Sequence, residues 1–217
     1  MNENLFETKY NVTKKSKFRK IYDENKLLIF STLFVFIMAS ISFGFYVVSK
    51  EKKEIILADN YIEARFYLKN NERDKGRKIL EEIIFANNRT YSTLSFFLIL
   101  NENLITDQKK MINLFEHLLK NNKFEEEIRN LITFKKILFQ SNFADEFDLI
   151  EATRPIINKD SIWKPHALLL LGDYFLSKKE YEKAKDFYKQ ILTLNNLNSR
   201  QEFYDHAKSK LRNIDNE

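Results

Sequence analysis

The longest apolar run in the chain extends from Leu27 to Val48 and contains no charged side chain. As an α-helix it would be about 33 Å long, at a rise of 1.5 Å per residue, and the hydrocarbon core of a bilayer is about 30 Å thick. Apolar helices in the cores of soluble proteins are usually shorter than this. The run therefore predicts a transmembrane helix over residues 27–48.

A cleaved signal peptide is the alternative interpretation of this run. Its apolar region would span roughly 7–15 residues and would be followed by small residues at a cleavage site. Here 26 residues precede the run, and bulky Phe43, Phe45 and Tyr46 lie near its end. The chain also has no cysteine through which a lipid anchor could attach. We interpret the run as an uncleaved membrane anchor.

Beyond the anchor, apolar residues recur at the spacing of amphipathic helices. No Pro or Gly interrupts residues 49–69, so we expect the transmembrane helix to continue into the first helix of the following domain. Later in the chain asparagines mark the breaks, because Asn tolerates the left-handed conformation that ends helices and also caps helix starts. The amphipathic segments between these breaks are Lys78–Phe85, Tyr91–Leu100, Lys110–Leu119, Glu125–Phe139 and Ala144–Ile157, which Pro155 kinks or ends.

Residues 165–198 follow the pattern of a tetratricopeptide repeat, a unit of about 34 residues that forms two antiparallel helices. Gly172 in the first helix and Ala184 in the second are small where the two helices would cross. Phe175, Tyr188 and Ile191 would fill the space around this close approach.

Other parts of the chain resemble weaker copies of this repeat. Residues 60–83 would form one pair of helices, with Ala64 and Gly76 as the small contacts. A second pair would begin near residue 91 and have a longer turn, because its second helix starts late, at Met111. The first helix of that pair shows the repeat spacing at Tyr91, Leu94, Ser95 and Leu98.

A final helix is predicted after the clear repeat, because residues 199–202 have the Ser-x-x-Glu pattern of a capping box. Its apolar stripe comprises Phe203, Ala207 and Leu211. Together these patterns predict an all-α protein, with a transmembrane helix, an α-solenoid of antiparallel helix pairs over residues 49–217 and a C-terminal capping helix.

The distribution of charge predicts the orientation of the anchor. Residues 1–26 carry seven Lys or Arg against four Asp or Glu, and such a basic excess stays on the cytoplasmic side. Aromatic and basic residues from Phe18 to Tyr22 suit a short interfacial helix, although a disordered basic tail is the alternative. In a bacterium the domain after the anchor would then be periplasmic. Its 29 basic and 27 acidic side chains form a mixed surface, which does not favour nucleic-acid binding.

The sequence contains no recognisable catalytic or metal-binding motif, so no cofactor is predicted. His117, His166 and His206 are far apart in sequence, and the three glycines are isolated rather than grouped in a phosphate-binding loop. Trp163, the only tryptophan, has two interpretations, as a core anchor or as a platform for ligand stacking.

Binding of a protein partner is the function class that remains. Solenoids bind their partners on the concave face, which is lined by the first helix of each repeat. In the clear repeat this face would carry His166, Leu169, Asp173 and Leu176; in the weaker one it would carry Phe96 and Ile99. The alternative is that these side chains pack against neighbouring helices.

The combination of a basic-aromatic tail, one span and a degenerate repeat domain resembles the ancillary SecYEG translocon subunit family, YfgM-like proteins, over most of residues 18–213. The best-matching parts are Phe18–Tyr22 and the stretch from Trp163 through Ala167 to Gly172. The resemblance implies a periplasmic domain that associates with the translocon and with PpiD, a membrane-anchored periplasmic chaperone, and that assists secreted or envelope proteins. This sequence differs from the family in its weak first repeats.

The sequence leaves two other functions open. The same architecture would serve as a scaffold that coordinates peptidoglycan or envelope assembly at division. An enzyme whose site leaves no motif is the third hypothesis.

Overall fold

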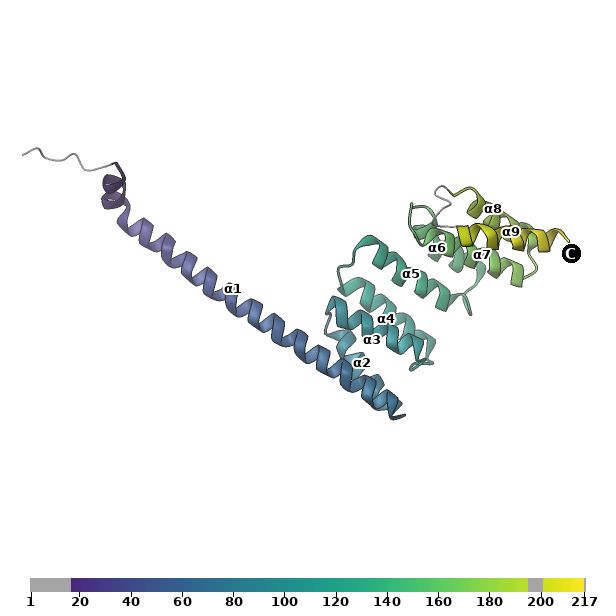
Figure 1. Ribbon diagram of the computed structural model, residues 1–217, viewed down its shortest axis with the longest axis horizontal. Helices are drawn as coiled ribbons and strands as arrows, with labels where there is room; N and C mark the ends of the chain where they lie inside the picture. Colours follow the sequence, from purple (N-terminus) through teal and green to yellow (C-terminus); the bar gives the residue numbers. More distant parts are fainter. Residues whose placement is uncertain (1–16, 195–200, 217) are drawn as a thin grey trace, which may run out of the picture. The chain divides into compact units, whose positions relative to one another are not determined.

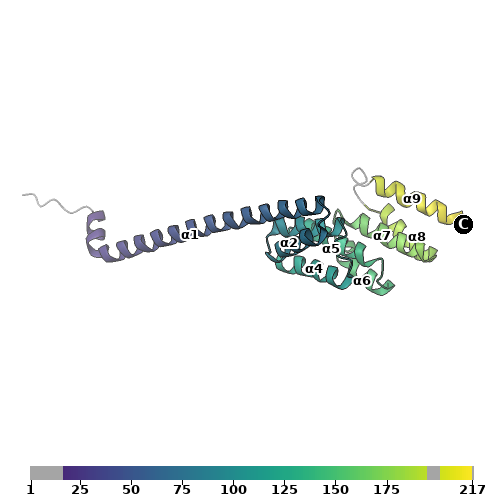
Figure 2. The ribbon, with the colours of Figure 1, turned by 90° about the horizontal axis from the view of Figure 1, so that it is seen from below.

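The computed structural model describes residues 17–194 and 201–216, and every regular element in this part of the chain is an α-helix. The chain divides after Ile56 into two compact units, residues 1–56 and 57–217. Figures 1 and 2 show the helices in order along the chain. They are α1 (Lys17–Lys69), α2 (Arg73–Phe85), α3 (Arg89–Asn101), α4 (Gln108–Asn121), α5 (Glu126–Gln140), α6 (Glu146–Ile157), α7 (Lys164–Ser177), α8 (Tyr181–Leu192) and α9 (Gln201–Asp215).

The first unit consists of the N-terminal part of α1. A kink at Asn25, where φ is −119° and ψ is 21°, separates a short helix from the long one that follows (Figure 1). Residues 18–22 are therefore helical, as expected, and from Lys26 the backbone stays helical to Lys69. The predicted helix over residues 49–69 is confirmed.

The long helix carries the apolar run. Among the described residues, α1 is the one helix long and apolar enough to cross a membrane, and none of its apolar stretch is buried against the rest of the chain. A buried core helix does not leave such a stretch exposed. An N-terminal signal sequence would also be exposed, but its apolar region would be shorter than residues 27–48. All-α architecture with a span-like N-terminal helix is therefore confirmed.

The second unit is a stack of helices held by three groups of buried apolar side chains. The first group joins the end of α1 to α2, α3, α4 and α5 around Phe96 and Phe115, whose ring centroids are 4.5 Å apart. The second joins α5, α6 and α7, and the third joins α7, α8 and α9. Neighbouring helices in the chain pack against each other, as a solenoid of amphipathic helices requires.

Small residues let the paired helices approach closely, as predicted for both positions. A Cβ atom added to Gly172 would lie 2.5 Å from the ring of Tyr188, and one added to Gly76 would lie 3.0 Å from the carbonyl oxygen of Ala64. Ser92 has the same role between α2 and α3, where its Oγ donates a hydrogen bond of 2.9 Å to the carbonyl oxygen of Ile83.

Asparagine ends several of the helices in the left-handed conformation. Asn71, Asn87 and Asn103 have φ values of 62°, 56° and 49°, and Lys179 adopts a similar value of 61°. Asn88 caps the start of α3 by accepting hydrogen bonds from the backbone N–H groups of residues 90 and 91. Asparagine therefore has both of the roles that the sequence predicted for it, at the end of helices and as a cap at a helix start. The residues of the predicted capping box before α9, Ser199 and Arg200, lie outside the described residues, as does the end of the repeat at 195–198.

The close contact at Gly172 yields a stability prediction. Gly172→Ala would push a methyl group into the buried ring of Tyr188, and overpacking of this kind costs about 1–3 kcal/mol. We expect a lower free energy of unfolding in urea, followed by circular dichroism of the detergent-solubilised protein. Gly44→Ala is the matched control, because its added Cβ meets no atom within 4 Å. Equal stability of the two variants would contradict the packing described here.

Candidate partner-binding surfaces

The predicted binding face of α7 is covered by α9. The ring of His166 lies 4.4 Å from that of Phe203, measured between centroids, and Lys210 Nζ lies 3.1 Å from Asp173 Oδ1. Leu169 and Leu176 pack, partly buried, in the group of side chains to which α9 contributes Ala207 and Ile214. Figure 2 shows α9 alongside α7 and α8. His166, Leu169 and Asp173 therefore stabilise the end of the stack. Leu176 also lines a pocket of about 340 Å³, to which Lys210 and Ile214 of α9 contribute.

Asp173 joins three helices. Its Oδ1 accepts a hydrogen bond of 2.7 Å from the hydroxyl of Tyr188 on α8 and pairs with Lys210 on α9. Burial of the Tyr188 ring raises the pKa of its hydroxyl, and the hydrogen bond to Asp173 and the negative charge of that carboxylate raise it further. The carboxylate thus has partners on both sides within the fold.

Phe96 and Ile99 do not line a groove, which corrects the prediction for the weaker repeat. Both side chains are fully buried in the first core group, where Phe96 packs edge-to-face on Phe115. The repeat spacing assigned four positions of this helix to packing, namely Tyr91, Leu94, Ser95 and Leu98. Of these only Ser95 is fully buried, and Leu94 is 43% exposed. The helix is rotated relative to the predicted register, so a partner cannot contact Phe96 or Ile99 without opening the core.

Trp163 anchors the start of α7 to α5. Its ring stacks on Phe134 with centroids 5.8 Å apart, and its Nε1 donates a hydrogen bond of 3.1 Å to the backbone oxygen of Glu127. Ser161, just before it, donates to the Glu127 carboxylate and accepts from Asn130. The geometry supports the core-anchor interpretation of Trp163.

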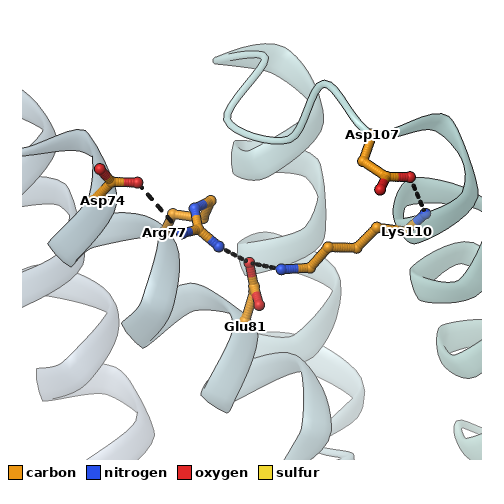
Figure 3. A network of polar contacts seen from close by, with 5 residues as sticks. All are labelled: Asp74, Arg77, Glu81, Asp107 and Lys110. Carbon is orange, nitrogen blue, oxygen red and sulfur yellow. Dashed lines mark hydrogen bonds and ion pairs between the residues drawn. The ribbon is translucent and has the colours of Figure 1, made fainter.

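Acidic and basic side chains also brace α2 against α4. Glu81 Oε1 lies 2.6 Å from Arg77 Nη1 and 2.8 Å from Lys110 Nζ, and Asp74 pairs with the same arginine (Figure 3). Asp107 caps α4 by accepting a hydrogen bond of 2.9 Å from the backbone N–H of Lys110. This network neutralises its own charges and thus fixes the two helices. Across the described residues, no group of three or more His, Cys, Asp or Glu side chains is placed to hold a metal ion.

An open groove lies instead between the end of α1 and α3. Its volume is about 610 Å³, and its most exposed apolar members are Ile62, 65% exposed, and Phe66, 60% exposed. Burying a side chain of this size is worth about 1.5–3 kcal/mol, so this surface favours a partner. The lining residues are Ile62, Arg65, Phe66, Leu68, Lys69, Leu98 and Glu102.

The sequence contains a signal for this groove in the apolar residues near the end of α1. Residues 55–68 carry two apolar stripes on different sides of one helix. Tyr61, Ala64 and Leu68 belong to the stripe that packs into the core. Because a helix at the end of a stack buries only one face, Ile62 and Phe66 of the other stripe remain exposed.

No family model, curated protein or solved structure matches this chain.

Partial burial of His166 yields a pH prediction. Burial lowers the pKa of this imidazole, while a backbone interaction with Ile162 and the charge of Glu202 act in the opposite direction; the charge of Lys135 makes a smaller contribution that also lowers the pKa. The pKa of His166 in the folded state is below its unfolded-state value of about 6.5. Neutral His166 therefore makes its full contribution to the free energy of unfolding above about pH 6.5. It is lost as the pH falls through the folded-state pKa.

We expect the urea midpoint of unfolding to be lower at about pH 5 than at about pH 8. This decrease should be smaller in His166→Phe. Circular dichroism at both pH values measures this difference. His206→Phe, which replaces an exposed histidine on α9, is the control. An identical pH dependence in wild type and His166→Phe would overturn the assignment of His166 to the α7–α9 interface.

Proposed function

We propose that this protein is a membrane-anchored periplasmic scaffold, of the chaperone-subunit type, that associates with the SecYEG translocon and assists emerging envelope proteins. The observation that carries the proposal is the pairing of an unburied, span-like α1 with a helical-repeat unit in which a groove with exposed apolar side chains stays open. A groove on a membrane-anchored unit suits capture of protein segments near a membrane channel. The resemblance to the ancillary translocon subunits supplies the identity of the channel and of a PpiD-like partner.

The charge of the segment before the apolar run supports the orientation. The basic excess in residues 1–26 favours a cytoplasmic N-terminus, and residues 49–217 would then be periplasmic. The absence of cysteine suits an oxidising compartment. A mixed charge on the repeat unit favours protein partners over nucleic acid.

The orientation is tested by reporter fusions. Alkaline phosphatase, which is active only in the periplasm, is fused after Glu217, and we expect high activity. Lys14→Glu and Lys15→Glu together should reduce it, because they remove two of the seven basic residues that hold the N-terminal flank in the cytoplasm. Fluorescence from a reporter that folds only in the cytoplasm, fused at the same position, would reverse the topology and with it the proposed function.

The translocon association is tested by photo-crosslinking in living cells. A photoreactive amino acid replaces Phe66 in the groove, or Phe36 in the apolar run, and crosslinked proteins are identified by mass spectrometry. We expect SecYEG subunits or a PpiD-like chaperone at one of these positions. Phe147 on α6, 70% exposed and outside the groove, is the control position.

Crosslinks to division or peptidoglycan enzymes, with septal localisation of a fluorescent fusion, would instead favour a scaffold for envelope assembly. Recovery of no translocon component at either position would count against the proposed function.

A further inference from the structure

The α1–α3 groove combines apolar and cationic side chains in alternation. Ile62 and Phe66 lie four residues apart on α1, and Arg65 and Lys69 lie four residues apart just beside them. Leu98 of α3 completes the apolar floor. A ligand for this surface needs apolar groups for the floor and negative charge for its edge.

The positive charge of the groove is not neutralised by its own acidic residue. Glu102 pairs with Arg73, whose guanidinium also donates a hydrogen bond to the Glu102 backbone oxygen. Within the described residues, neither Arg65 nor Lys69 forms an ion pair. Like charges four residues apart on a helix repel each other slightly, and a bound carboxylate would relieve that repulsion.

The spacing of the two cations defines the geometry of the ligand. Four residues of helix advance about 6 Å, so carboxylates four residues apart on a second helix would match Arg65 and Lys69. Apolar residues on the adjoining stripe of that helix would meet Ile62 and Phe66. We propose that the groove binds an amphipathic helical segment of a partner protein that carries acidic residues beside its apolar stripe. This inference rests on the proposed function and names the chemistry of the partner at that site.

Two other occupants fit the groove less well. A second copy of this chain, paired groove to groove, would bring the same two cations into opposition. An anionic lipid surface is flat, and a recess between two helices contacts a flat surface poorly. A protein segment meets neither obstacle.

The test uses the full chain in nanodiscs of zwitterionic phosphatidylcholine. The probe is a fluorescein-labelled peptide of about 16 residues, roughly four helical turns, with leucine and glutamate on adjacent stripes. A twin peptide has lysine in place of every glutamate. Fluorescence anisotropy measures both dissociation constants, and we expect the acidic peptide to bind at least about tenfold more tightly than its twin.

Groove variants locate the binding site. Phe66→Ala and the double variant Arg65→Glu with Lys69→Glu should each weaken binding of the acidic peptide by about tenfold or more. Phe147→Ala is the matched apolar control. Lys78→Glu with Lys189→Glu is the matched charge control, because both lysines are exposed and lie outside the groove. Binding to the two controls should stay within about twofold of wild type.

Several outcomes would overturn the inference. One is equal binding of the two peptides, and another is an equal loss in the groove variant and in the charge control, which would indicate non-specific attraction. Loss of peptide binding when phosphatidylglycerol is added to the nanodiscs would assign the groove to lipid, and dimerisation that Phe66→Ala abolishes would assign it to a second copy. The assay needs no translocon, so its failure is distinct from a failure of the crosslinking test.

Discussion

A stack of amphipathic helices leaves an apolar face at each end. In the second unit of this protein the two end faces are covered to different extents, and this difference decides which end can bind a partner. At the C-terminal end α9 lies on α7 and α8, and Asp173 fixes it through Lys210. At the N-terminal end α1 buries Ala64 and Leu68 but keeps Ile62 and Phe66 exposed. The closed end has the stronger repeat signature, whereas the open end has the surface available to a partner.

The two ends also differ in how their charges are satisfied. At the closed end, one carboxylate of α7 contacts a hydroxyl from α8 and an ammonium group from α9, so its charge is used inside the fold. At the open end, the acidic residue Glu102 pairs with Arg73 and leaves the basic groove residues to solvent. Charge therefore distinguishes a structural contact from a surface suited to binding, even where the apolar residues look alike.

The sequence predicted some helices well because their polar residues define one face. In α4 the apolar residues that recur at helical spacing, Met111, Leu114, Phe115 and Leu118, are the four that are buried. In α3 most positions are apolar or small, so spacing alone did not fix the rotation, and Phe96 and Ile99 were wrongly assigned to a groove. The sequence also did not predict that α9 covers His166 and Asp173, because this contact depends on where a helix later in the chain packs. The sequence shows both apolar stripes at the end of α1. It does not show which of the two packs into the core and which stays exposed.

Helix α5 contributes side chains to two of the core groups, and this affects how the second unit responds to force or denaturant. Ile132 of this helix enters the first core group, and Phe134 and Ile137 enter the second. In a stack whose parts contact only their neighbours, the coupling between the two halves then passes through the two faces of a single helix. Each half can open as a separate cooperative unit when α5 remains docked on the other. The N-terminal half can therefore change its packing around a bound segment while α7, α8 and α9 stay folded.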